Sequence, residues 1–281
     1  MKEISTQKIT EVVESLCLEA AYNLGQDVEA LIRSGLAKEE SEFGKYIIGQ
    51  ILDNIEIARN EKTAMCQDTG ITVVYVEIGQ DVHVVGGSLQ EAIHEGVRKG
   101  YTSGYLRKSV VADPLFKRIN TKDNTPAVIY LDMVPGESLK IMVVPKGGGS
   151  ENMSAIKMLK PSDGVDGVKD FIVQTVTQAG GNPCPPVIVG VGIGGTMEKA
   201  AMLAKKALTR QAGKANEDPN YARLESEVLE KINLSGVGPQ GLGGRVTALA
   251  VHIEDFPTHI AALPVAVNIN CHASRHAEAI L

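Results

Sequence analysis

Three cysteines stand where the sequence predicts loops at the ends of helices and strands. Cys66 opens the segment CQDTG, Cys184 lies within NPCPP, and Cys271 lies within NINCHASRH. Thiolates on loops with a restricted backbone suit an iron–sulfur cluster, because such a site must be formed before the metal arrives. Their spacing is far from any CxxC pattern, so from spacing alone three small buried hydrophobic residues remain the alternative.

The fourth cysteine, Cys17, has a different setting. It lies on the apolar face of an amphipathic helix predicted over residues 7–24, beside Leu16 and Ala20, and this predicts a packing role. Four scattered cysteines in 281 residues are too few for a disulfide scaffold.

The elements that must position these loops alternate between helix and strand. Helical periodicity predicts further helices over 45–59, 89–100 (with a capping box from Ser88 to Glu91), 151–159, 165–179, 197–209 and 221–232. Runs of β-branched and apolar residues predict strands over 71–78, 127–134, 138–144, 187–193, 245–253 and 264–270, with 127–134 and 138–144 joined as a hairpin at Pro135–Gly136. The interleaving predicts a mixed α/β (α+β) fold, a sheet core with surrounding helices, in one compact domain over residues 1–281.

Composition excludes several classes of function. A net charge of −6 argues against a nucleic-acid surface, and an aromatic content of 4% argues against platforms that stack bases. No apolar run is long enough to span a membrane, and the N-terminal segment has no apolar signal core. We therefore expect a cytoplasmic protein that binds neither nucleic acid nor membrane.

Five motifs, in order along nearly the whole chain, carry a family resemblance: CQDTG at 66–70, YLRKS at 105–109, KGGGSEN at 146–152, GNPCPP at 181–186 and HIAALPVAVNINCHASRH at 259–276. Together they resemble the class I fumarases and the related iron–sulfur subunits of L-tartrate dehydratases. The resemblance implies that Cys66, Cys184 and Cys271 hold a [4Fe–4S] cluster with one iron that lacks a protein ligand. That iron would act as a Lewis acid in the reversible hydration of fumarate to L-malate, or alternatively in the dehydration of L-tartrate to oxaloacetate.

The resemblance also implies roles for polar residues around a small dicarboxylate substrate. Gln67 and Asp68 match positions that contact the substrate, with Asp68 assisting proton transfer; the alternative for Asp68 is an Asx turn. Arg107 matches the arginine that grips a substrate carboxylate, and its alternative is a surface arginine. Either Gly148 or Gly149 is expected to bring a backbone N–H close to a substrate oxygen.

Histidines accompany the last motif. His259 matches an active-site histidine of the family, although a lone histidine more often has a structural role. His272 and His276 flank Cys271, and we interpret them as supporting or surface groups.

Gly190, Gly192 and Gly195 spell GxGxxG after a predicted strand, which is the pattern of a dinucleotide-binding loop. The region that should end in a confirming acidic residue reads as helix and loop instead, so the glycines indicate either close packing or a role in shaping the cluster loop. A nucleotide-binding redox protein remains the alternative from a different class.

The family implies one partner. Single-chain members continue with a second domain after the last cluster cysteine, whereas this sequence ends ten residues after Cys271. We therefore expect a separate β subunit, in an α2β2 heterotetramer, to supply the remaining substrate-binding groups.

Overall fold

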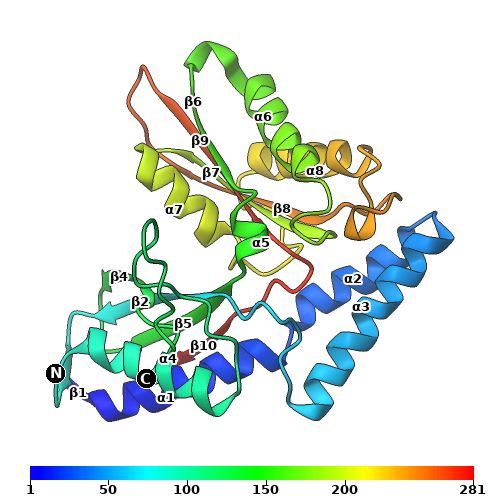
Figure 1. Cartoon of the computed structure of the whole chain (residues 1–281). Coiled ribbons are helices and arrows are strands. Elements are labelled where there is room, and N and C mark those ends of the chain that lie inside the picture. Colours follow the sequence, from blue (N-terminus) through cyan, green and yellow to red (C-terminus); the bar gives the residue numbers. More distant parts are fainter. The chain divides into compact units, whose positions relative to one another are not determined.

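The structure is a computed structural model that describes all 281 residues, and the chain divides into two compact units. Unit 1 comprises Met1–Leu24, Asn54–Gly148 and Arg275–Leu281, and unit 2 comprises Gly25–Asp53 and Gly149–Ser274. Where the sequence suggested one compact domain, each unit has its own sheet and its own hydrophobic core. Helices and strands interleave along the chain, which confirms the predicted mixed α/β class (Figure 1).

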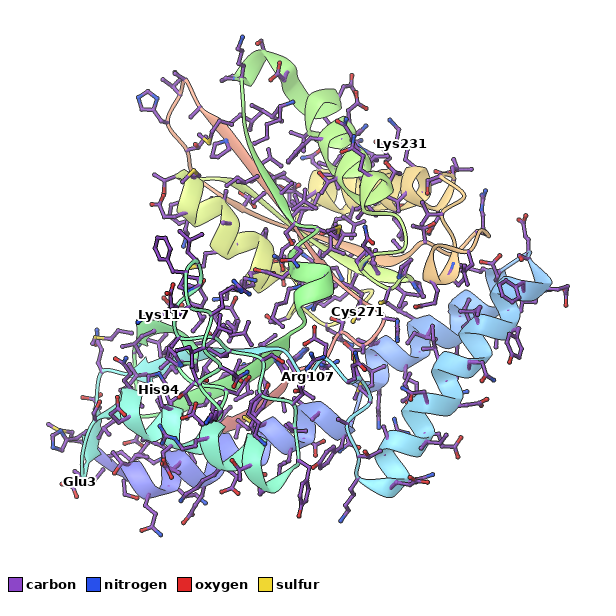
Figure 2. All side chains as sticks on the ribbon, in the orientation of Figure 1. Glu3, His94, Arg107, Lys117, Lys231 and Cys271 are labelled. Atoms are coloured by element: carbon purple, nitrogen blue, oxygen red, sulfur yellow. The ribbon has the colours of Figure 1, made fainter.

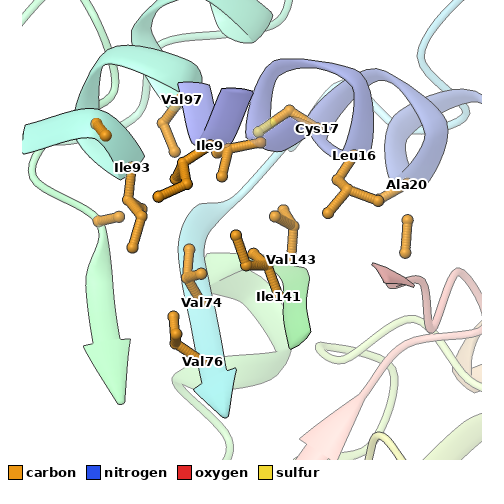
Figure 3. Close-up of a cluster of buried hydrophobic side chains, with 14 of the residues drawn as sticks. Ile9, Leu16, Cys17, Ala20, Val74, Val76, Ile93, Val97, Ile141 and Val143 are labelled. Carbon is orange, nitrogen blue, oxygen red and sulfur yellow. The ribbon is translucent and has the colours of Figure 1, made fainter. Parts of the chain in front are cut away.

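Unit 1 is a sheet with two helices packed on it. Its elements are β1 (Lys2–Ser5), α1 (Thr6–Tyr22), the end of α3 (Glu42–Glu61), β2 (Ile71–Gly79), β3 (Val82–Val85), α4 (Leu89–Ser103), β4 (Val128–Val134), β5 (Leu139–Lys146) and β10 (Ala277–Ile280). The main sheet has the order β10-β5-β2-β4, and β1 pairs with β3 beside it. Side chains of α1, α4, β2 and β5 form the core, which includes Cys17 (Figure 3).

The helices of unit 1 start and pack as their sequences dictate. The Ser88 side chain caps α4 by accepting a hydrogen bond from the backbone N–H of Glu91, as the capping pattern predicted. Gly96 and Gly100 of α4 face α1, where an added Cβ would lie 2.6 Å from Val13 Cβ and 2.8 Å from Cys17 Cβ respectively. The two glycines therefore allow the helices to pack closely.

The predicted hairpin of 127–134 and 138–144 is wrong. Both strands exist, as β4 and β5, but β2 lies between them and pairs parallel with β4 and antiparallel with β5. β2 carries the fully buried Val73, Val74 and Val76, so it takes the central place in the sheet. A tight turn at Pro135–Gly136 does not by itself make its flanking strands neighbours.

Unit 2 is a sheet covered on both faces. Its elements are α2 (Gln26–Lys38), the start of α3, most of α5 (Gly148–Glu151), β6 (Ala155–Leu159), η1 (Pro161–Asp163), α6 (Gly164–Ala179), β7 (Val187–Gly194), α7 (Met197–Ala207), α8 (Pro219–Asn233), η2 (Pro239–Gly241), β8 (Ala248–Phe256) and β9 (Leu263–Asn270). The sheet has the order β6-β9-β7-β8. Apolar side chains of α6 and α8 pack on one face, and alanines of α7 pack on the other.

In unit 2 one helix prediction is wrong and one helix was missed. The predicted helix over 151–159 is wrong, because residues 155–159 form strand β6, paired antiparallel with β9. Pairing with a strand distant in sequence overrides the local helical pattern there. Helix α2 was not predicted.

No helix of the chain is both long and apolar enough to cross a membrane.

Candidate active site

The motif loops of unit 1 gather at one end of its sheet. β2 starts and β5 ends there, since the two strands are antiparallel and Ile71 pairs with Lys146. β10 starts at the same end, with Ala277 paired to Val143, and β4 enters parallel to β2. The CQDTG loop, the start of the glycine loop, the segment that carries Arg107 and the residue Arg275 therefore share this end of the sheet.

Asp68 links two of these loops. Its Oδ1 accepts a hydrogen bond from the backbone N–H of Gly70 at 3.0 Å, and its Oδ2 accepts one from the N–H of Gly148 at 2.7 Å. The first bond is the Asx turn that the sequence offered as an alternative. The second fixes the start of the glycine loop, so the structure brings Asp68 and Gly148 together and gives both carboxylate oxygens a backbone donor.

Hydrogen bonds join the backbone of the Arg107 segment to the CQDTG loop. The side chain of Arg107, which Figure 2 labels, is exposed, whereas its carbonyl accepts a hydrogen bond from Thr69 Oγ1 at 2.8 Å. Asn124 is fully buried and bridges the two segments, because its Nδ2 donates to Gly70 O at 3.1 Å and its Oδ1 accepts from Ser109 N at 2.8 Å. These bonds hold the backbone of Arg107 at a fixed place relative to Asp68.

Two further buried side chains support the same loop. Tyr101 donates its hydroxyl to Thr69 O at 2.6 Å, and burial raises the pKa of Tyr101, which keeps that donor protonated. Arg275 donates from Nη2 to Asp68 O at 2.6 Å. Sequence analysis assigned no role to these residues. Arg275 lies within the family motif at 259–276, so its membership of that motif could have indicated a role, whereas Tyr101 lies outside all five family motifs.

Two cysteines of unit 2 share one end of its sheet. β7 begins shortly after Cys184, β9 ends directly before Cys271, and the strands are antiparallel with Ile188 paired to Asn270. His272 directly follows Cys271, which Figure 2 labels, and its backbone N–H donates to Cys184 O at 3.3 Å. Unit 2 therefore brings together Cys184 and Cys271, which are far apart in the sequence.

The cysteines are of the ligand type that an iron–sulfur cluster uses, although the structure itself brings together no group of three His, Cys, Asp or Glu side chains that could hold a metal ion. None of the four cysteines is in a disulfide bond; Cys184 is exposed, and Cys66 and Cys271 are half-buried at loop ends. Thiolates of this kind are the ligands that such clusters use. Cys17 differs, because it is 1% exposed in the core of unit 1, and burial together with the nearby Glu14 raises the pKa of its thiol to about 12. Its predicted packing role is confirmed.

The end of the glycine loop is anchored inside unit 2. Glu151 accepts hydrogen bonds from Lys205 Nζ at 2.6 Å and from Asn268 Nδ2 at 2.8 Å. Asn268 Nδ2 also donates to Ser154 Oγ at 2.9 Å, and these four side chains line a cavity of about 200 Å³. The segment after Gly149 is thus held by side chains of α7 and β9.

Gln67 and His259 have different positions. Gln67 is exposed beside Cys66 in unit 1. His259 is exposed in the loop between β8 and β9, and the eight residues of β9, about 26 Å of extended chain, separate that loop from Cys271. Within unit 2 the structure does not bring His259 to the cysteines, and its catalytic role stays a prediction.

The GxGxxG segment packs against a helix. Gly190 and Gly192 lie inside β7, where an added Cβ would come within 2.1 Å of Ala204 O and 2.0 Å of Ala200 O. The glycines therefore let α7 lie directly on the sheet, and their backbone groups pair with β8 and β9. This arrangement supports the packing interpretation over a phosphate-binding loop.

A family model described as fumarate hydratase (fumerase) matches residues 10–280. The chain belongs to the fumarate hydratase family. Among similar proteins, the L(+)-tartrate dehydratase subunit alpha of Escherichia coli strain K12 is 33% identical over 279 residues, which cover 98% of this chain and 91% of that one. A protein of Methanocaldococcus jannaschii that carries the same name provisionally is 45% identical over 275 residues, 96% of each chain. The comparisons thus place the chain in a hydro-lyase family.

Proposed function

We propose that this fumarate hydratase family member is the alpha subunit of a [4Fe–4S]-dependent hydro-lyase that reversibly hydrates fumarate to L-malate. Cys66, Cys184 and Cys271 would hold the cluster. The observation that carries the proposal is the gathering of Cys184 and Cys271 at one end of the unit 2 sheet, by loops that the family motifs mark. When bound, the cluster supplies a Lewis acid for a substrate hydroxyl or carboxylate.

The residues of unit 1 would bind the dicarboxylate and move its proton. The exposed guanidinium of Arg107 can form a charge-assisted pair with a substrate carboxylate, and its backbone is held by Thr69. Asp68 is the proposed proton-transfer group, since two backbone N–H bonds fix the orientation of its carboxylate. Gln67 would add an amide contact, and Gly149 a backbone N–H.

A β subunit would complete the site. The relatives that cover most of this chain are named as alpha subunits. A dicarboxylate needs cations at both ends, and Arg107 supplies one guanidinium. We therefore propose a β partner, in an α2β2 assembly, that supplies further cations and excludes water from the site.

Iron content tests the ligand assignment directly. Cys66→Ser, Cys184→Ser and Cys271→Ser should each lower the iron bound per chain after anaerobic reconstitution and abolish hydratase activity. Cys17→Ala, which removes a buried thiol from the core of unit 1, should keep the iron content of the wild type. Loss of iron in the Cys17 variant, with full iron in any of the other three, would contradict the assignment.

Substrate choice needs a comparison of three acids. L(+)-tartrate is the second candidate, because the named relatives are L(+)-tartrate dehydratase subunits. We expect kcat/KM for L-malate and fumarate to exceed that for L-tartrate when the chain is assayed with its β partner. A preference for L-tartrate would replace the fumarate assignment and leave the cluster chemistry unchanged.

A further inference from the structure

Two consecutive carbonyls beside Cys184 are each held twice. Cys184 O accepts from the backbone N–H of His272 at 3.3 Å and lies 3.0 Å from the Nδ1 of the same residue. Pro185 O accepts from the backbone N–H of Gln240 at 2.8 Å and from its Nε2, also at 2.8 Å. His272 thus contacts Cys184 O, and Gln240 contacts Pro185 O, each through its backbone N–H and its side chain.

The contact with Cys184 O favours the tautomer of His272 that carries its proton on Nδ1. Cys184 O can only accept, so the proton must sit on Nδ1 for this contact to be a hydrogen bond. Gln240 Nε2 lies 3.2 Å from the same Nδ1 and has two N–H groups: one donates to Pro185 O, and the other would donate to Nδ1 only in the opposite tautomer. With Nδ1 protonated, all four contacts to the two carbonyls are satisfied together.

The loop that carries Gln240 packs directly on the cysteine loop. Cys184 and Gln240 both have a positive φ, 55° and 53°, which ordinary side chains rarely adopt and which surrounding contacts must hold. Gly241 lies so close to Gly181 that an added Cβ would be 2.4 Å from Gly181 Cα. The two loops therefore meet backbone to backbone.

The base of the Gln240 loop is fixed by a buried carboxylate. Glu39 is 2% exposed and accepts hydrogen bonds from the backbone N–H groups of Arg245 and Val246 at 2.8–2.9 Å. Burial acts to raise the pKa of Glu39, but these N–H groups, with those of Glu40 and Ser41, outweigh it and lower the pKa. The ionised carboxylate thus anchors the loop from one end.

We infer that Gln240 and His272 are positioning residues that hold the Cys184 loop in ligand geometry before the cluster binds. They do so by donating hydrogen bonds to the carbonyls of Cys184 and Pro185. Because His272 is the residue next to Cys271, its bonds to Cys184 O also join the two cysteine segments. The inference rests on the proposed cluster. The side chains of Gln240 and His272 would therefore affect the rate at which iron is lost from the cluster, whereas the residues of unit 1 would bind and transform the substrate.

The test compares iron retention among matched variants of the full chain. Gln240→Met keeps the side-chain length and the backbone donor but removes the Nε2 donor, and Gln211→Met changes an exposed glutamine of the same unit. His272→Ala removes the Nδ1 donor, whereas the amide nitrogen of His272→Asn can take its place. Each protein is reconstituted anaerobically, checked by circular dichroism, and exposed to a ferrous chelator.

We expect Gln240→Met and His272→Ala to release iron about fivefold faster than the wild type, the factor expected for one lost hydrogen bond. His272→Asn and Gln211→Met should release iron at the wild-type rate. The electron paramagnetic resonance spectrum of the cluster, recorded after one-electron reduction, should change in the first pair only. Wild-type release and spectra in both Gln240→Met and His272→Ala would overturn the inference.

Failure of the cluster proposal gives a separate result. If the wild type took up no cluster, amide hydrogen exchange of residues 181–187 in the chain without iron decides the matter. Faster exchange there in Gln240→Met than in Gln211→Met supports the positioning role, and equal exchange overturns it. The same measurement applies to any variant that binds too little iron for the release assay.

Discussion

Replacing Asn124 tests whether the two loops of unit 1 are joined as the structure indicates. Asn124 is fully buried and adopts φ 63°. Asn124→Ala removes the donor to Gly70 O and the acceptor of Ser109 N. It also places alanine in the left-handed region, which asparagine tolerates better.

The cost follows from these three losses. Two hydrogen bonds at about 1 kcal/mol each and about 1 kcal/mol of backbone strain give a destabilisation of about 3 kcal/mol. Asn120→Ala is the matched control, because Asn120 bonds Lys108 O and Lys122 N from an exposed position in the same segment. We expect it to change the free energy of unfolding by less than about 0.5 kcal/mol.

Urea unfolding of wild type, Asn124→Ala and Asn120→Ala measures the free energies, and amide hydrogen exchange reports on Ser109 directly. Exchange at Ser109 should accelerate only in Asn124→Ala. Because the tie holds Arg107 relative to Asp68, KM for the dicarboxylate should rise more than kcat falls. An Asn124→Ala protein within about 0.5 kcal/mol of wild type, with unchanged exchange at Ser109, would refute the reasoning.

Two further substitutions probe the charged groups of each unit. Arg107→Ala should lower kcat/KM by about one to two decades, since a charge-assisted bond contributes about 1.5–3 kcal/mol, and its iron content should not change. Lys108→Ala, the control, should have a smaller effect. Wild-type steady-state kinetics in Arg107→Ala would remove Arg107 from the site. Glu39→Gln should destabilise the chain by about 2–3 kcal/mol in urea unfolding, because an amide offers one acceptor oxygen where the buried carboxylate has two. The exposed Glu40→Gln is its control, and equal effects would contradict the anchoring role.

Local pattern was a good guide to single elements and a poor one to their partners. The periodicity of α1 and the Ser88 cap of α4 are properties of a few neighbouring residues, and both were predictable. The place of β2 between β4 and β5, and the pairing of β6 with β9, depend on strands distant in sequence. No local period records such a partnership, so the hairpin and the helix over 151–159 were predicted wrongly.

The candidate site divides in the same way. Motif loops located Asp68 and the cysteines at sheet ends, whereas Asn124 and Gln240 act on residues 54 and 55 positions away and had no local signal. His259 is instructive, because a strand was predicted over 264–270, between it and Cys271. A strand between two residues places them at opposite ends of a sheet, so this separation could have been anticipated from the sequence.

A buried histidine of unit 2 links stability to pH. His252 is 1% exposed on β8; its Nε2 accepts from the backbone N–H of Gly213 at 3.3 Å, and its Nδ1 lies 3.2 Å from Ala207 O. Burial and the nearby Arg210 lower the pKa of His252 from 6.5 to about 4, although Glu225 acts in the opposite direction. The folded chain therefore holds this imidazole neutral.

Acid should remove the stabilisation that depends on neutral His252. As the pH falls below 6.5 the unfolded chain gains a proton that the folded chain takes up only near pH 4, so stability is lost across that window. At about pH 5 the loss is about 2 kcal/mol relative to neutral pH. His252→Gln keeps an acceptor for Gly213 N and cannot titrate, so the difference in unfolding free energy between wild type and variant should shrink by that amount on acidification. Subtracting the two urea-unfolding curves at each pH cancels the carboxylates that both proteins share. A difference that stayed constant from neutral pH to about pH 5 would show that His252 does not set the acid sensitivity.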